Sequence, residues 1–157
     1  MKAFNLVFRF ARNYTTQLVV TVISMILLVG VQLLIPWVIR SLVAAVTQQP
    51  VDSGTMAHVT RLTIVTAVAL VAKGVLQFLR SYMAHIAGWG VVADMRKYLY
   101  QHLQRLSLRF YEDKQTGQMM SRIVNDTDLF EMLIAHAVPD IIVNVLTFVG
   151  VSVMLML

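Results

Sequence analysis

The feature that most constrains the fold is a long uncharged stretch near the N-terminus. No charged residue occurs from Asn13 to Ile39, and arginines stand at both ends, at positions 12 and 40. An α-helix needs roughly 20 apolar residues to cross the hydrocarbon core of a bilayer. A secretory signal is the alternative, but its apolar region is only about 7–15 residues long. The stretch therefore predicts a first transmembrane helix over residues 17–40.

The composition agrees with a chain that is embedded in lipid. Hydrophobic residues make up 58% of the 157 residues and charged residues only 13%, against about 25% charged residues in soluble domains. The net charge of +5 indicates membrane topology rather than nucleic-acid binding, because the basic residues mostly flank apolar stretches. The absence of cysteine excludes disulfides and thiolate metal sites. We expect an all-α, polytopic membrane protein.

A second apolar stretch predicts a second span with a cytoplasmic extension, over residues 62–107. Lys73 and Arg80 interrupt it, and a basic residue in mid-membrane costs about 2.5–3.5 kcal/mol. If the membrane core is Leu62–Ser81, Lys73 lies deep in the bilayer. If the core is Gly74–Ala93, Arg80 lies deep instead.

A third apolar stretch, over residues 141–157, has no polar anchor after it, so we expect a third span in a fragment of a longer protein. Basic residues predict the orientation, because Lys and Arg accumulate on the cytoplasmic side. They are frequent before the first span and over residues 94–140, and sparse over residues 41–61. We therefore expect a cell-membrane protein with a cytoplasmic N-terminus, a cytoplasmic 94–140 segment and an outer 41–61 loop.

The cytoplasmic segment has the pattern of a helical hairpin, because apolar residues recur at helical spacing on both sides of a charged tip at residues 108–117. At the tip, Phe110 and Tyr111 are expected to be exposed. They indicate either a docking surface for a cytosolic partner or a solvated turn whose Phe packs on its own hairpin. The two apolar runs are Met95, Tyr98, Leu99, Leu103 and Leu106, and then Met120, Ile123, Val124, Thr127, Phe130 and Ile134.

One continuous motif in this hairpin resembles a known family. It is MRKYLYQHLQRLSLRFYEDKQTGQMMSRIVND, at residues 95–126, and it resembles the first intracellular loop of ATP-binding cassette (ABC) exporters. In that family a basic amphipathic helix, an aromatic pair, a TG step and an SR followed by ND recur in this order. The resemblance implies the N-terminal portion of a six-span half-transporter. Such a protein pairs with an identical or homologous half and couples ATP hydrolysis to the export of lipids, drugs or peptides.

The resemblance also implies roles for particular segments. Residues 1–16 look like the family's interfacial elbow helix, residues 108–117 like its coupling helix, and residues 118–157 like the returning extension with a truncated third span. The coupling helix would sit on a nucleotide-binding domain, which would hold ATP and Mg²⁺. The residues matched to it are Arg109, Phe110, Tyr111, Glu112, Asp113, Lys114 and Gln115.

The family motif continues just after the coupling helix. Gly117 would allow the turn into the returning helix, and Arg122 would pair with Asp126 four residues further on. The matched residues are Thr116, Gly117, Ser121, Arg122, Asn125 and Asp126.

Outside the motif, Lys73, Gln77 and Arg80 share one helix face by their spacing. They indicate either the lining of a translocation path or snorkelling side chains. The alternative to an exporter is a stand-alone three-span membrane protein that docks a cytosolic partner through residues 94–140. The sequence that follows Leu157 would distinguish the two.

The chain carries no recognisable catalytic pair, and its glycines show no P-loop spacing, so ATP is not expected to bind to it by that route. The segment Gly88-Trp89-Gly90 indicates close helix packing rather than a nucleotide site. The four histidines, at positions 58, 85, 102 and 136, are far apart in the sequence. They predict isolated structural residues and no metal site.

Overall fold

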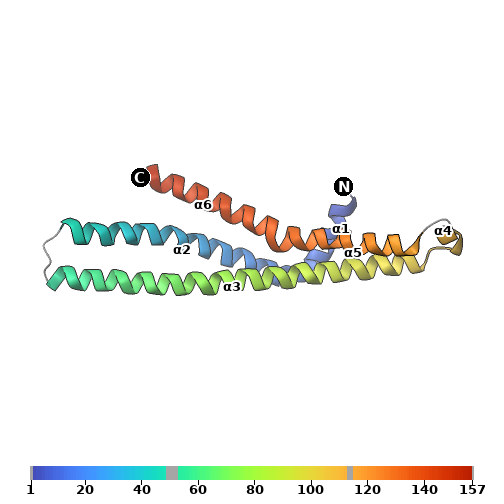
Figure 1. The fold of residues 1–157 in the computed structure, drawn as a ribbon, viewed down its shortest axis with the longest axis horizontal. Helices are drawn as coiled ribbons and strands as arrows, with labels where there is room; N and C mark the ends of the chain where they lie inside the picture. Colours follow the sequence, from blue (N-terminus) through green and yellow to red (C-terminus); the bar gives the residue numbers. More distant parts are fainter. Residues whose placement is uncertain (1, 49–52, 113–114, 157) are drawn as a thin grey trace. The chain divides into compact units, whose positions relative to one another are not determined.

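The computed structural model describes residues 2–48, 53–112 and 115–156, and within these ranges the chain is almost entirely helical with no strand. The all-α prediction is therefore confirmed. Figure 1 shows the helices in chain order. They are α1 (Lys2–Ala11), a 3-10 turn (Arg12–Tyr14), α2 (Thr15–Gln48), α3 (Ser53–Gln104), α4 (Leu108–Glu112), α5 (Thr116–Met132), a π turn (Leu133–Ala137) and α6 (Val138–Met156).

The helices are longer than the apolar stretches alone indicate. The loop expected over residues 41–61 is mostly helical, because α2 continues to Gln48 and α3 begins at Ser53. Ser53 and Gly54, which belong to the expected loop, lie instead in the first turn of α3. Pro36 does not end α2, which continues for several further turns.

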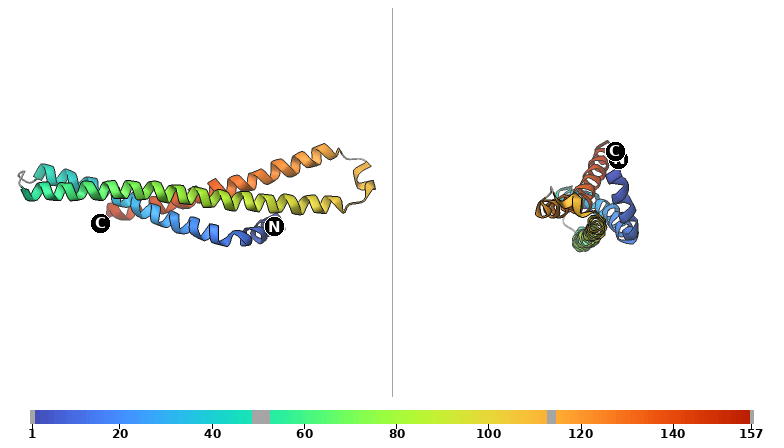
Figure 2. Two further views of the ribbon diagram at one scale, coloured as in Figure 1. Left: turned by 90° about the horizontal axis from the view of Figure 1, so that it is seen from below. Right: turned by 90° about the vertical axis from the view of Figure 1, so that its right-hand side faces the viewer.

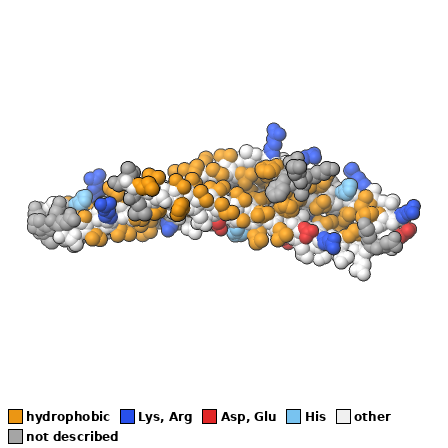
Figure 3. Space-filling view, turned by 90° about the horizontal axis from the view of Figure 1, so that it is seen from above, with side chains coloured by type: hydrophobic (Ala, Val, Ile, Leu, Met, Phe, Trp, Pro, Cys, Tyr) orange, Lys and Arg blue, Asp and Glu red, His pale blue; other side chains and the backbone are white. Residues whose placement is uncertain are grey.

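Three continuous helical runs are long and apolar enough to cross a membrane. They are Leu6–Ala45, Gly54–Gln104 and Thr116–Met154. Only 11% of the most apolar 18-residue stretch of the second run is buried by the rest of the chain. Figure 3 shows hydrophobic side chains spread over much of the surface on the face that it draws. Lipid or further helices must therefore cover these side chains, as expected for a multi-pass membrane protein.

The chain divides into two compact units, and one of them is formed by residues 22–80 and 141–157. In this unit α6 packs against α2 through a small apolar cluster of Met25, Val29 and Val143, with Leu33 beside it. Figures 1 and 2 show the C-terminal part of α2 running beside the N-terminal part of α3. This unit therefore contains most of the residues of the three apolar stretches.

The other unit is formed by residues 1–21 and 81–140. In it α5 runs back along the C-terminal half of α3, and α4 lies at the far end of this hairpin (Figures 1 and 2). The N-terminal segment docks on α3: the Phe10 and Tyr98 rings meet edge to face with centroids 5.9 Å apart. The Asn13 amide and the Tyr14 hydroxyl each donate a hydrogen bond to Asp94, at 3.4 Å.

Gly90 allows this docking. A Cβ atom at position 90 would overlap the ring of Tyr14, and one at position 88 would press against Glu131 and Ala135. The two glycines of the Gly88-Trp89-Gly90 segment therefore serve close packing of α3 against its neighbours, as predicted.

The returning helix contains one wide turn just before the third apolar stretch. The π turn spans Leu133–Ala137, and the Val138 N–H donates to the Leu133 carbonyl, five residues back. Pro139 follows, and it has no N–H to donate to the carbonyl of Ala135 and would clash with it in a regular α-helix. A wider turn relieves that clash, which gives a physical reason for the π turn at this place.

We predict that Gly90→Ala destabilises the protein by roughly 1–3 kcal/mol, because the added methyl group has to displace the Tyr14 ring and its bond to Asp94. The measurement is the thermal unfolding midpoint of the purified full-length protein in detergent. Gly74→Ala, in the same helix, is the matched control because nothing lies within 4 Å of its Cβ position. Equal midpoints for the two variants would contradict the prediction.

Candidate functional site

The tip of the hairpin is a separate structural element. The helix α3 ends at Gln104, and a turn follows in which the Arg105 N–H donates to His102 at 3.1 Å and the Leu106 N–H to Leu103 at 3.0 Å. The helix α4 then runs across the end of the hairpin, and α5 begins at Thr116. Asp113 and Lys114 lie outside the described residues, so their expected place at the tip stays a prediction.

Tyr111 fastens α4 to α3. Its hydroxyl donates a hydrogen bond of 2.7 Å to the Leu103 carbonyl, one of the last carbonyls of α3, which have no partner within the helix. The Phe110 ring packs edge to face on Tyr111, with centroids 5.3 Å apart. Both aromatic side chains are half-buried rather than exposed, because they pack within the tip. The expectation that they are exposed is therefore wrong.

The exposed face of the tip consists of other residues. Leu108 is 86% exposed, and among the large apolar side chains that the structure describes only Met156 is more exposed. Arg109, Glu112 and Gln115 are also exposed. An exposed apolar side chain next to charged ones is the arrangement that protein-docking surfaces use. Leu108 lies within the expected tip at residues 108–117, but the residues matched to the coupling helix began at Arg109.

A hollow of about 200 Å³ lies where the tip joins the two long helices. Two methionines contribute to its wall, and this flexible side chain adapts to irregular spaces. The hollow is lined by residues of α3, α4 and α5. Its lining residues are Tyr100, Leu103, Gln104, Tyr111, Thr116, Met119 and Met120.

The motif residues after the tip lie on the first turns of α5. Thr116 and Gly117 are its first two residues, so the helix break lies before them, and no glycine in the described residues has a positive φ. The Asn125 amide donates to the Ser121 hydroxyl at 3.2 Å. Their roles stay predictions.

The pair expected between Arg122 and Asp126 is absent: in the described part of the chain the two side chains form no ion pair. Both instead line an apolar hollow of about 250 Å³ among α1, α3 and α5. The other lining residues are Leu6, Met95, Leu99, Ile123, Thr127 and Phe130.

Arg96 joins the two long helices of the hairpin. Its Nε donates to the Thr127 hydroxyl at 2.9 Å, and one terminal nitrogen donates to the Val124 carbonyl at 3.0 Å and to Asp128 at 2.6 Å. Thr127 is only 2% exposed. The apolar spacing placed Thr127 on the buried face, but nothing in the sequence paired it with an arginine 31 positions away.

Lys73, Gln77 and Arg80 lie on α3 in the unit formed by residues 22–80 and 141–157. Lys73 and Arg80 are half-buried and Gln77 is exposed. Their part in a translocation path stays a prediction.

Two of the four histidines are not isolated. The rings of His85 and His136 meet with centroids 4.9 Å apart, and His85 Nδ1 lies 3.0 Å from a carboxylate oxygen of Glu131. The expectation of four scattered histidines is therefore wrong for this pair. His58 and His102 are exposed.

The described chain combines helices long enough to cross a membrane with a helical hairpin that ends in a short exposed helix. This is the architecture of the membrane region of a transport protein. The chain belongs to the ABC transporter transmembrane region family, whose sequence pattern matches residues 18–157. The resemblance noted in the hairpin is thereby confirmed, and the protein is a multi-pass membrane protein.

Curated relatives agree with this family. Putative multidrug export ATP-binding/permease proteins from the COL, MW2 and Mu50 strains of Staphylococcus aureus are each 31% identical over 145 residues. The matched region is 90% of this chain and 25% of each relative. The chain therefore spans about a quarter of the length of the relatives that it matches.

We predict that Thr127→Val lowers the stability of the protein by about 1–3 kcal/mol, because it leaves the Arg96 Nε without its buried acceptor. Asp128→Asn should cost less than about 1 kcal/mol, since Asp128 is 62% exposed and water screens its charge. The measurement is again the unfolding midpoint of the full-length protein.

Thr63→Val is the matched control, because the exposed Thr63 hydroxyl bonds only the Val59 carbonyl of its own helix. An effect of Thr127→Val no larger than that of Thr63→Val would show that Arg96 does not hold the hairpin together.

Proposed function

We propose that this chain is the N-terminal part of the membrane domain of an ABC exporter, and that the α4 tip couples it to a nucleotide-binding domain. The observation that carries the proposal is the tip itself. A short helix that exposes Leu108 and Arg109 lies at the end of a hairpin in a chain of this family. The relatives are named as putative multidrug export proteins, which supports drug-like molecules as the exported substrates.

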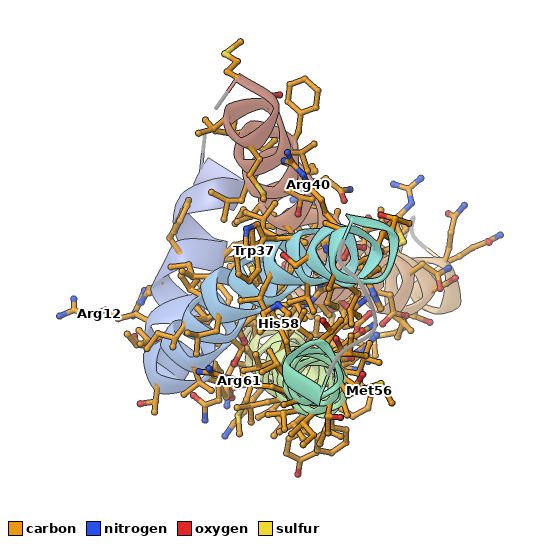
Figure 4. The ribbon with its side chains drawn as sticks, turned by 90° about the vertical axis from the view of Figure 1, so that its left-hand side faces the viewer. Arg12, Trp37, Arg40, Met56, His58 and Arg61 are labelled. Carbon is orange, nitrogen blue, oxygen red and sulfur yellow. The ribbon has the colours of Figure 1, made fainter. Side chains whose placement is uncertain are left out.

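The proposed orientation has the N-terminus and the tip in the cytoplasm of a cell-membrane protein. Figure 4 labels Trp37 and Arg40 of α2 and His58 and Arg61 of α3, which all belong to the unit formed by residues 22–80 and 141–157. Tryptophan and arginine are typical of membrane–water interfaces, and they flank the apolar stretches here. The proposed outer side is the connection between α2 and α3, which these residues flank.

The contact between His85 and Glu131 supports one placement of the second span. Glu131 belongs to the segment expected in the cytoplasm, and its carboxylate lies 3.0 Å from His85. A polar contact between titratable side chains at this level favours a membrane core at Leu62–Ser81 rather than further along α3. In this placement Lys73 lies deep in the bilayer, facing protein or water, and Arg80 reaches the interface.

Two polar contacts join the helices of the hairpin, and they would transmit a movement of α4 to α3 and α5. Tyr111 ties α4 to the end of α3, and Arg96 ties α3 to α5 further along. A movement of the docked tip would therefore carry both long helices together as a rigid body. The helix α3 continues without a break into the apolar stretch that crosses the membrane. In the proposed assembly the ATP and Mg²⁺ sites belong to the nucleotide-binding domain, and a second half completes the transporter.

The exposed face of the tip provides the test of this function. We predict that Leu108→Ala combined with Arg109→Ala lowers ATP-dependent ethidium uptake into inverted vesicles about tenfold, the effect of losing roughly 1.4 kcal/mol at an interface. ATP hydrolysis should persist, because the variant changes the docking surface and not the ATPase. Both rates are measured on the full-length protein.

The matched control is Leu129→Ala combined with Lys97→Ala, which removes one exposed apolar and one exposed basic side chain from the body of the hairpin. Its uptake should equal that of the unchanged protein. Normal uptake by the tip variant would contradict coupling through α4, and equal losses in both variants would show that the tip has no special role.

A further inference from the structure

Three potential metal ligands meet where the hairpin approaches the third apolar stretch. One ligand atom from each of His85, Glu131 and His136 lies within 4.8 Å of the others. His85 comes from α3, Glu131 from α5 and His136 from the π turn. All three belong to the unit formed by residues 1–21 and 81–140, so their relative positions are set within one compact body.

The π turn brings Glu131 and His136 together. In a regular α-helix two residues five apart are separated by about 140° around the axis and face different neighbours. The π turn of Leu133–Ala137 closes its hydrogen bond over five residues instead. This wider turn moves His136 toward the face that carries Glu131. Turns of this kind often occur at functional sites.

Small residues bring α3 close enough for His85 to complete the group. Ala84 and Ala87 are at most 1% exposed, and Ala135 in the π turn is 4% exposed. A Cβ atom at position 88 would stand 3.4 Å from the Glu131 side chain and 3.5 Å from Ala135. The close approach of the backbones therefore places the three longer side chains around one point.

The ligand types define the class of ion. Two imidazoles and one carboxylate suit Zn²⁺ and neighbouring divalent transition metals, whereas Mg²⁺ and Ca²⁺ prefer oxygen ligands alone. A three-ligand set leaves one coordination position for water. The 3.0 Å between His85 Nδ1 and the Glu131 oxygen is close to the separation of two ligands on a tetrahedral ion, roughly 3.3 Å for bonds of about 2.0–2.1 Å.

The cluster is accessible to an ion. The His85 and Glu131 side chains are 28% and 20% exposed, and His136 is exposed. The exposed side of the cluster allows an ion to enter without unfolding the helices. The Trp89 ring lies against His85 with centroids 5.4 Å apart and limits the positions that the imidazole can take.

We propose that His85, Glu131 and His136 form a binding site for a divalent transition-metal ion of the Zn²⁺ class. The bound ion joins α3 to α5 and the π turn at the root of the hairpin, far along the helices from the α4 tip. It stabilises the contact between the two long helices in the way that Arg96 does nearer the tip.

The test is zinc binding to the full-length protein, purified without a histidine tag, stripped with a chelator and free of nucleotide. Titration with Zn²⁺ by calorimetry should show a site that His136→Ala weakens at least tenfold, with a similar loss in His85→Ala. Zn²⁺ should also raise the unfolding midpoint of the unchanged protein, but not that of the two variants.

His58→Ala and His102→Ala are the matched controls, because each removes one exposed histidine from the same helix α3. Unchanged binding in these controls is expected. If His85→Ala fails to fold, His136→Ala alone tests the proposal. The His136 side chain is exposed, and its removal leaves Glu131 paired with His85. Zinc binding that persists in His136→Ala, or that is lost equally in the controls, overturns the proposal.

Discussion

Backbone hydrogen bonds inside lipid must be made within the chain, and this constraint keeps every long apolar stretch helical. The helix α3 shows the consequence most clearly, because its 52 residues extend about 78 Å at 1.5 Å per residue, against a hydrocarbon core of about 30 Å. Much of α3 therefore lies outside the bilayer. The apolar face of this projecting half has to be covered, and α5 packs against it to form the hairpin.

Different kinds of polar contact join the helices at the tip, in the middle and at the root of the hairpin. At the tip, a tyrosine hydroxyl satisfies a helix-end carbonyl and fixes the short helix α4. In the middle, one arginine bonds a buried threonine and an exposed aspartate on the opposite helix. At the root, two histidines and a glutamate meet beside a π turn. Polar contacts thus position two helices whose apolar faces alone would allow sliding.

The sequence was sufficient for the parts of the fold that depend on local pattern. The uncharged stretch at Asn13–Ile39 predicted a span, and the helical spacing predicted a hairpin with Thr127 on its buried face. The hydrogen bonds of Arg96 and the histidine cluster could not be predicted from local pattern, because they join residues far apart in the chain. His136 was hidden further by the π turn, since periodicity arguments assume 3.6 residues per turn. The half-buried state of Tyr111 depends on its hydrogen bond to the Leu103 carbonyl near the end of α3, a contact that apolar spacing does not reveal.

The central proposal is that the α4 tip contacts a nucleotide-binding domain in the cell. The described chain contains no cysteine, so Leu108→Cys introduces a single reactive thiol at the tip, once any cysteines elsewhere in the full-length protein are replaced. The decisive measurement is a short thiol-to-amine crosslink from this position in native membranes, identified by peptide mass spectrometry. The account predicts a crosslink to a nucleotide-binding domain. Reaction of the thiol with a membrane-impermeant reagent added outside the cell, with no such crosslink, would contradict it.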